Sequence, residues 1–297
     1  MPLGRFFGLL FLGTAGIIML TVWFFPTNIH FETQNPSWNG LKDFEEEFHA
    51  TSLETLDALP QNAEGSVLLV IPYLEPTEAD VAQLRVYLER GGVLILADDY
   101  GYGNTVLEGL GVSARFSGAL LLDSLFNYRT AYFPLATNLE PSPLTTEVSS
   151  LALNYASALE GKGLSVVARS SPFSYLDLNN DGERNTSEPV GPFPVVGQIM
   201  VGKGHLILLA DPSIFINTML AAEDNRQFVQ NLLGSVGPDP HIFIDQVHTP
   251  SSRLEQAKAA LAAVRQLAAQ PAMLAAFTLV LTFTLLGPWR RRKGVLA

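Results

Sequence analysis

The sequence has no cysteine, only five histidines and few basic residues, and these shortages exclude several kinds of chemistry. Without cysteine, the chain folds without disulfides and offers no thiol nucleophile. The histidines include no pair at the spacing of metal ligands, and no G-x-S-x-G sequence marks a serine nucleophile. They are His30, His49, His205, His241 and His248. No catalytic motif is evident.

The basic residues are also unevenly placed. Of the 18 Lys and Arg residues, five lie near the ends of the chain, whereas all 29 Asp and Glu residues lie between residues 26 and 271. The charge of that stretch is therefore 13 − 29 = −16. Because so negative a surface repels phosphate backbones, we expect no nucleic acid partner. Divalent cations and basic protein surfaces are better suited to it.

Two uncharged apolar stretches, Phe6 to Phe25 and Ala272 to Trp289, stand at opposite ends of the chain. A hydrocarbon core of about 30 Å takes roughly 17 to 25 helical residues, so both stretches predict transmembrane helices. Cationic residues near helix ends stay in the cytoplasm. Arg5 and the basic run Arg290 to Lys293 therefore place both termini inside the cell.

This topology predicts a two-pass cell-membrane protein with four parts. They are an N-terminal transmembrane anchor (1–26), an extracytoplasmic α/β domain (27–250), a juxtamembrane helix (251–271) and a second transmembrane helix with a basic tail (272–297). A secretory signal peptide is the alternative for the first stretch, but the run ends in WFFP and has no A-x-A cleavage pattern. A buried core helix is the alternative for the second, although four consecutive cations suit a membrane interface better.

Between these ends, apolar runs bounded by turn residues alternate with helical patterns, which is typical of a parallel α/β sheet. Strands are predicted at Ile29–Thr33, Ser66–Ile71, Val93–Ala97, His205–Ala210 and His241–Ile244. Helices are predicted at Leu41–His49, from the N-cap Thr77 to Gly91, near Thr105–Leu110, within Asn225–Leu233 and over Arg253–Gln270. Thr77 and Asp80 have the spacing of a capping box. The stretch Phe116–Val201 is expected to hold shorter strands and loops.

The sequence DLNNDGERNTSE, Asp177 to Glu188, matches the D-x-[DN]-x-[DN]-G-x5-E calcium loop at every position. Hard oxygen ligands at alternating positions suit calcium. The expected ligands are Asp177, Asn179, Asp181, the carbonyl of Glu183, Asn185 directly or through water, and a bidentate Glu188. Pro189 and Pro192 forbid a regular exiting helix, so we expect an isolated loop between strands. The alternative is a surface turn that binds no metal.

Acidic residues follow several of the predicted strands. Asp98 and Asp99 follow one, Asp211 follows another and Asp245 ends the last. In open α/β sheets, ligands bind beyond the carboxyl ends of parallel strands, so Asp98, Asp99, Asn104 and Asp211 are candidates for lining a ligand crevice. The commoner use of Asp at such positions is to cap the following helix or turn, and that alternative stays open.

Two glycine-rich stretches resemble phosphate-binding motifs only in part. In GQIMVGKG, Gly204 replaces the Ser or Thr that would hold magnesium, and the apolar half predicts a hairpin with its turn at Gly202 and Gly204. Gly101 and Gly103 lack the third glycine of a dinucleotide fingerprint. We therefore expect no nucleotide ligand.

Several segments together resemble a known family. They are NPSWNG, GGVLILADDYGYGN, GPFPVVGQIMVGKGHLILLADPSIFIN and DNRQFVQNLL. With them, most of Asn35 to Asp245 resembles membrane proteins that carry the domain of unknown function 4350. The resemblance implies a flavodoxin-like, class I glutamine amidotransferase-like three-layer sandwich. At the place where an amidotransferase carries its nucleophilic Cys, this chain has Asp98, Asp99 and Tyr100, so no catalytic residue is carried over.

From these observations we expect a non-catalytic, extracytoplasmic binding or scaffold module of a membrane complex, of the kind that accompanies transporters. Its partners would be other membrane proteins, and calcium would rigidify one loop. The alternative is an extracytoplasmic hydrolase that uses Asp98, Asp99 or Asp211. A purely structural surface protein is a third reading.

Overall fold

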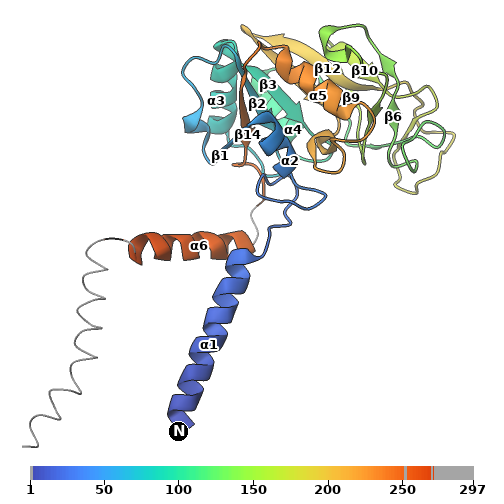
Figure 1. Cartoon of the computed structure of the whole chain (residues 1–297). Helices are drawn as coiled ribbons and strands as arrows, with labels where there is room; N and C mark the ends of the chain where they lie inside the picture. The colour runs from blue at the N-terminus through green and yellow to red at the C-terminus, as the bar shows by residue number, and fades with distance from the viewer. Residues whose placement is uncertain (1–2, 251–252, 269, 271–297) are drawn as a thin grey trace, which may run out of the picture. The chain divides into compact units, whose positions relative to one another are not determined.

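The computed structural model describes residues 3–250, 253–268 and 270. They belong to two units, one of residues 26–250 and the other of residues 1–25 with 251–297 (Figure 1). The unit of residues 26–250 holds the sheet, the hydrophobic core and the candidate sites.

An eight-stranded sheet runs through this unit in the order β1-β14-β2-β3-β13-β12-β10-β7. The first five strands in this order pair in parallel, and the last three extend the sheet with antiparallel pairing. Their bounds are Thr51–Leu53 (β1), His241–Asp245 (β14), Ser66–Val70 (β2), Val93–Ala97 (β3), Gly204–Leu209 (β13), Pro194–Val201 (β12), Ser165–Arg169 (β10) and Asn138–Leu139 (β7). Every residue of β2 and β3 is buried, as their continuous apolar sequences require of central parallel strands.

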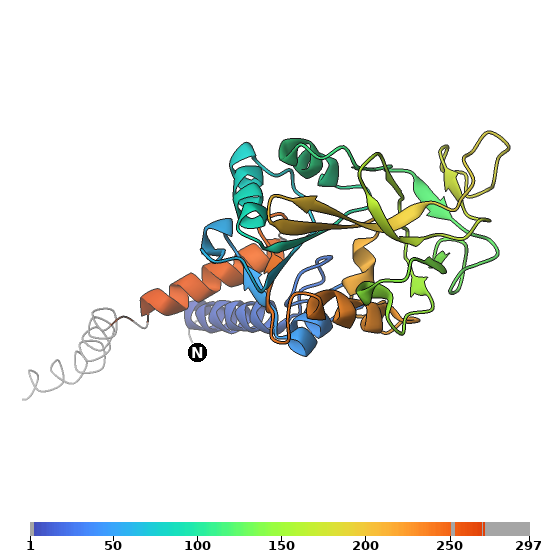
Figure 2. The same cartoon turned by 90° about the horizontal axis from the view of Figure 1, so that it is seen from above.

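Helices cover both faces of the sheet (Figure 2). One face carries α3 (Glu78–Glu89) and α4 (Gly103–Leu110), and the other carries α2 (Lys42–Phe48) and α5 (Asn225–Gly234). The predicted capping box opens α3, because the Thr77 side chain accepts from the Asp80 N–H and the Asp80 side chain accepts from the Thr77 N–H. The mixed α/β fold with a large, mostly parallel central sheet is thus confirmed.

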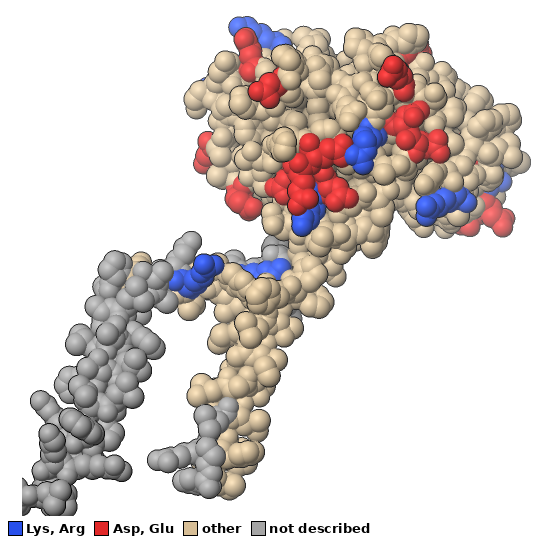
Figure 3. All heavy atoms as spheres, in the orientation of Figure 1, with Lys and Arg blue, Asp and Glu red and all other residues tan. Residues whose placement is uncertain are grey.

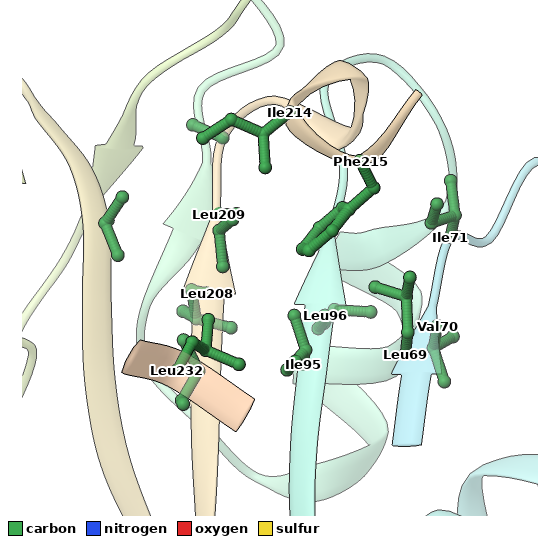
Figure 4. Close-up of a cluster of buried hydrophobic side chains, with 14 of the residues drawn as sticks. Leu69, Val70, Ile71, Ile95, Leu96, Leu208, Leu209, Ile214, Phe215 and Leu232 are labelled. Atoms are coloured by element: carbon green, nitrogen blue, oxygen red, sulfur yellow. The ribbon is translucent and has the colours of Figure 1, made fainter. Parts of the chain in front are cut away.

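The core lies on both faces of the central strands, against α3 and α4 on one side and α2 and α5 on the other. Leu96 and Leu208 are fully buried, with Phe215 of the short helix η3 (Pro212–Phe215) above them and Leu232 of α5 beside Leu208 (Figure 4). Fully burying one such side chain stabilises the fold by about 1.5–3 kcal/mol. The unit therefore needs no disulfide to hold its sheet and helices together.

The stretch between α4 and β12 consists of short strands, as expected. Three two-stranded sheets pair β4 (Arg115–Phe116) with β9 (Leu159–Glu160), β5 (Leu120–Leu122) with β11 (Tyr175–Asp177) and β6 (Leu135–Ala136) with β8 (Leu151–Ala152). Two short helices, η1 (Leu56–Ala58) and η2 (Pro143–Thr145), complete the described elements of this unit. The predicted hairpin at GQIMVGKG joins β12 to β13 and turns at Gly202, whose φ is +61°.

One expected strand, Ile29–Thr33, was wrong, because this segment is a loop. Phe31 has a φ of +59°, which interrupts an extended chain, and the buried Asn35 amide donates to the Ile29 carbonyl and to Asn39 Oδ1. The edge position of the sheet belongs instead to β1, which begins at Thr51.

The first and last segments of the unit are clasped together by one side chain. Gln246 Oε1 accepts from the Thr33 N–H at 3.2 Å, and its Nε2 donates to the Phe31 carbonyl at 3.1 Å. The His248 carbonyl accepts from the N–H groups of Tyr73 and Leu74. Entry and exit of the chain therefore lie side by side.

The other unit contains α1 (Leu3–Phe24) and α6 (Arg253–Ala268). Within the described residues, α1 alone is long and apolar enough to cross a membrane, a criterion that a signal sequence also meets. The alanine-rich helix predicted at Arg253–Gln270 is confirmed as α6. The second predicted span, Ala272–Trp289, and the basic run Arg290–Lys293 lie outside the described residues.

Candidate functional site

A cavity of about 580 Å³ lies at the carboxyl ends of the central parallel strands. Tyr73 after β2, Asp99 after β3 and Ser213 after β13 line it. The chain leaves β3 toward α4 on one face of the sheet and leaves the neighbouring β13 toward α5 on the other. Ligand sites in open α/β sheets form at such a switch in direction. The cavity is therefore the candidate site.

Asp99 is the acidic residue of the predicted crevice that lines this cavity. It is only 6% exposed, and its Oδ1 accepts from the Tyr73 hydroxyl at 2.9 Å and from the Tyr100 N–H at 2.6 Å. Its second oxygen, Oδ2, accepts no hydrogen bond from another described residue. Burial raises the pKa of Asp99, and burial together with the nearby carboxylates strongly raises the pKa of Tyr73. Tyr73 therefore stays a proton donor to Asp99.

The walls of the cavity are aromatic. Six Phe, Trp or Tyr side chains line it, namely Phe31, Trp38, Tyr73, Tyr128, Phe133 and Tyr155. Phe31 stacks on Tyr73 with ring centroids 5.3 Å apart, and His30 meets Trp38 edge to face. Phe31 and Tyr155 also have positive φ angles, +59° and +54°. Bulky side chains rarely adopt this conformation, and such strain gathers at binding sites.

Asp98 and Asn104 do not line the cavity and instead hold the turn after β3. The Asp98 oxygens accept from the N–H groups of Gly101 and Gly103 at 2.7 and 2.8 Å. Burial raises the pKa of Asp98 to about 6, although these two bonds oppose the shift. The Asn104 amide makes two hydrogen bonds to the backbone of Phe116. Both side chains therefore stabilise the local backbone conformation through hydrogen bonds.

Asp211 has a similar structural role at the end of β13. Its Oδ1 caps η3 through the Ser213 N–H at 2.7 Å, and its Oδ2 accepts from the Asn154 N–H at 2.7 Å. Asp211 is 1% exposed, and burial raises its pKa to about 7. It thus ties the loop that carries Asn154 and Tyr155 to the central sheet, next to the cavity.

Asp245 at the end of β14 is paired with a histidine. Its Oδ2 lies 2.5 Å from His248 Nδ1, and its Oδ1 accepts from the Val247 N–H. The other ring nitrogen of His248 lies 3.4 Å from Asp80 Oδ2. Burial lowers the pKa of His248, but the two carboxylates outweigh it and raise the pKa above its usual value. This pair stabilises the last segment of the unit, after β14, and does not line the cavity.

The predicted calcium loop folds as an irregular loop after β11, and its two terminal acids are both buried. Asp177 accepts from the N–H groups of Asp181 and Gly182. Glu188 accepts from the N–H groups of Leu178 and Asn185 at 3.0 and 2.9 Å. The two ends of the twelve-residue stretch are thereby drawn together around its centre.

The middle of that loop carries the other predicted ligands. The Asp181 Oδ2 accepts from the side-chain amides of Asn179 and Asn185, at 2.8 and 2.9 Å. Across residues 3–250, 253–268 and 270, no three His, Asp or Glu side chains converge closely enough to hold a metal ion. For Asp181 to join the other predicted ligands of a calcium ion, it would have to turn from its two amide partners.

Comparison with protein-family models identifies the family of this chain. The model of the family described as Domain of unknown function (DUF4350) matches residues 33–233, more than half of the chain. The chain belongs to the DUF4350 family. That match contains the cavity's strand ends and the calcium-type loop. No curated protein matches the sequence.

Solved structures resemble this DUF4350 protein in fold. The "mmIFT52 N-terminal domain" has a TM-score of 0.51 and 15% identity, over 68% of this chain and 92% of that one. A beta-galactosidase from Bacillus circulans sp. alkalophilus has a TM-score of 0.36 and 10% identity, over 58% of this chain and 22% of that one. At these identities, the first likeness shows the fold alone and the second carries no argument.

Proposed function

We propose that this DUF4350 protein is a membrane-anchored, non-catalytic binding module that acts outside the cytoplasm within a membrane complex, such as one that accompanies a transporter. The observation that carries the proposal is the aromatic cavity at the switch point of the sheet, which has the volume of a small-ligand site. The apolar helix α1 supports a membrane anchor. The strongly acidic composition of residues 26–271 suits basic partner surfaces. On the face drawn in Figure 3, acidic side chains form clusters on the unit of residues 26–250.

The finer fold assignment is part of the same proposal. A central parallel sheet with helices on both faces supports a flavodoxin-like, class I amidotransferase-like sandwich. At the turn where that fold would carry its nucleophile, Asp98 instead binds two backbone N–H groups. The two-pass topology, with both termini in the cytoplasm, rests on Phe6–Phe25, Ala272–Trp289 and the basic run that follows.

The hydrolase alternative has weaker support. Asp98 and Asp211 both hold backbone N–H groups with both oxygens. None of the hydrogen bonds in the described part of the chain joins a histidine to a serine or threonine. Of these three acids, Asp99 alone lines the cavity. Esterase, peptidase and glycosidase screens with Asp99→Asn as the control test this alternative, and turnover that the substitution abolishes would establish it.

The binding proposal is tested by capture from native membranes. Full-length protein is cross-linked in its membrane, purified in mild detergent and compared with two variants that add the same bulk in different hollows. Thr218→Trp blocks the aromatic cavity, whereas Thr51→Trp adds the same ring to a hollow beside β1; both positions are exposed. We expect stoichiometric partners that Thr218→Trp loses and Thr51→Trp keeps. If both variants capture the same partners, the cavity is not the binding site. If no partner is captured at all, the protein is not part of a membrane complex.

We further propose that the loop Asp177–Glu188 binds calcium. Asp177, Asn179, Asp181 and Glu188 would supply side-chain oxygens, with the Glu183 carbonyl and Asn185 completing the set. The hydrogen bonds that already close the loop around Asp177 and Glu188 support this assignment. Bound calcium would stiffen the loop between β11 and β12.

A matched pair of variants tests the calcium proposal. Glu188→Gln removes the bidentate ligand, whereas Glu183→Gln changes a side chain whose backbone carbonyl does the binding. In the full chain, millimolar calcium is expected to raise the melting temperature of the wild type and of Glu183→Gln, and to leave Glu188→Gln unchanged. If calcium shifts none of the three, the loop is a turn only.

A further inference from the structure

The cavity has a buried carboxyl group without a cationic partner at its floor. Asp99 is 94% buried, and no described residue other than Asp99 itself offers a hydrogen bond to its Oδ2. Asp98 and Asp211, both buried, lie close enough for charge interaction with Asp99. None of these three carboxylates takes part in an ion pair within the described part of the chain. A cation in the cavity would supply the missing counter-charge.

The aromatic walls suit the same kind of ligand. A cation within about 6 Å of an aromatic ring face is attracted by the ring's quadrupole. The protein already makes this contact at the rim, where the Arg129 guanidinium lies 5.0 Å from the centre of the Tyr128 ring. Tyr155, which is 49% exposed, and Trp38, which is 57% exposed, present further ring surface to a ligand. Among the cavity's described lining residues, Arg129 is the only Lys or Arg.

Hydrogen-bonding capacity narrows the class of cation. A primary ammonium group carries three N–H donors and needs an acceptor for each. Three polar side chains of the lining already donate to the protein: Asn39 to the Asn28 carbonyl, Ser213 to the Asn154 carbonyl and Thr218 to the Trp38 carbonyl. Among the described lining residues, Asp99 is the only carboxylate. A methylated ammonium with one N–H or none needs few acceptors and is attracted by ring faces, so it fits these aromatic walls better than a lysine-type amine or a sugar.

We propose that the cavity binds a small molecule with a tertiary or quaternary methylated ammonium group, with Asp99 as counter-ion and the rings of Trp38 and Tyr155 around the head group. This inference rests on the proposed function in one respect, that the cavity is a ligand site. Because a volume of about 580 Å³ exceeds that of a trimethylammonium group, the natural ligand extends beyond its head group. Choline alone should therefore bind with a dissociation constant on the order of millimolar.

The test uses the full-length protein in detergent micelles with Trp38 as the reporter. The chain has three tryptophans, so Trp23→Phe with Trp289→Phe leaves only the one in the cavity. Choline is titrated against 3,3-dimethylbutan-1-ol, its neutral isostere, and against n-butylamine. We expect choline to change the Trp38 fluorescence at a concentration roughly tenfold lower than either competitor.

Matched substitutions locate the binding. Asp99→Asn keeps the shape of the side chain and should weaken choline binding by about tenfold or more while leaving the isostere unchanged. Asp239→Asn, the same change at an exposed position beside another hollow, should have no effect. Tyr155→Leu removes a half-exposed ring and should weaken choline binding several-fold. Arg129→Gln removes a like charge at the rim and should strengthen it.

The outcomes separate this inference from the proposed function. Equal binding of choline and its isostere, or tighter binding of n-butylamine, overturns the ligand class while the cavity remains a ligand site. If none of the three probes binds but Thr218→Trp still loses the membrane partner, the cavity receives a protein segment, and only this inference falls. If no probe binds and Thr218→Trp also keeps every partner, both fall.

Discussion

The buried carboxylates predict that the domain loses stability as the pH rises from 5 to 8. Asp211 and Asp98 have pKa values of about 7 and about 6 in the folded chain, against a usual value of 3.8. A folded-state pKa above the unfolded value gives stability that is fully present below 3.8 and is lost as the pH rises through 6 and 7. Between pH 5 and 8 the linkage relation gives about 3 kcal/mol for Asp211 and about 1 kcal/mol for Asp98, a total of about 4 kcal/mol.

Two other groups act in the same direction. The pKa of Asp99 is raised by burial, and that of His248 is raised by Asp245 and Asp80 against the effect of burial. The stability from His248 is present below its unfolded pKa of 6.5 and is lost as the pH rises through its higher folded value. Asp80 has a lowered pKa, so its contribution is lost only below its usual 3.8 and leaves this window unaffected.

The assay is urea unfolding of the full-length Trp38-only protein in micelles at pH 5, 6, 7 and 8. Asp211→Asn should remove about 3 kcal/mol of the pH-dependent change, whereas Asp239→Asn, at an exposed position, should leave the slope as in the wild type. A free energy of unfolding that stays constant or increases from pH 5 to 8 would show that these carboxylates ionise at ordinary values and would refute the reasoning.

Three further predictions concern the fold. Thr77→Ala removes the capping box with Asp80 and should cost about 1 kcal/mol, and a loss below about 0.3 kcal/mol in urea unfolding would contradict its role. Phe215→Ala opens the fully buried core and should cost about 3–5 kcal/mol; a cost near that of a surface change would mean that η3 is not packed as described. Gly40→Ala would place a Cβ only 1.9 Å from the Asn35 carbonyl oxygen, so the loop before α2 must shift. A loss of about 2 kcal/mol or more is expected in the same assay, and full tolerance would argue against this loop conformation.

Local sequence signals were enough to predict four of the five parallel strands, β2, β3, β13 and β14. Continuous apolar runs located β2 and β3 because central parallel strands are buried on both faces, and the Thr77–Asp80 spacing located the start of α3. The segment Ile29–Thr33 was wrongly predicted as a strand. Its alternating apolar residues belong to a loop that long-range hydrogen bonds from Gln246 hold in place. No local pattern contains that information.

The candidate site was predicted only in part. A strand-end rule pointed to Asp99, and the structure places it in the cavity. The same rule could not distinguish Asp99 from Asp98 and Asp211, because an acid that caps a turn and an acid that lines a ligand site both follow a strand in the sequence. The aromatic walls were missed altogether. Trp38, Tyr128 and Tyr155 come from three distant loops, so their convergence depends on tertiary structure.

The clasp at Gln246 joins the two ends of the unit of residues 26–250. Because its first and last segments are hydrogen-bonded to each other, a pull that separates the two ends loads the Gln246 bonds. A pull on the last segment also loads the His248 carbonyl, which accepts from the N–H groups of Tyr73 and Leu74 just after β2. Since the Tyr73 hydroxyl donates to Asp99, force on that segment is transmitted to the floor of the cavity.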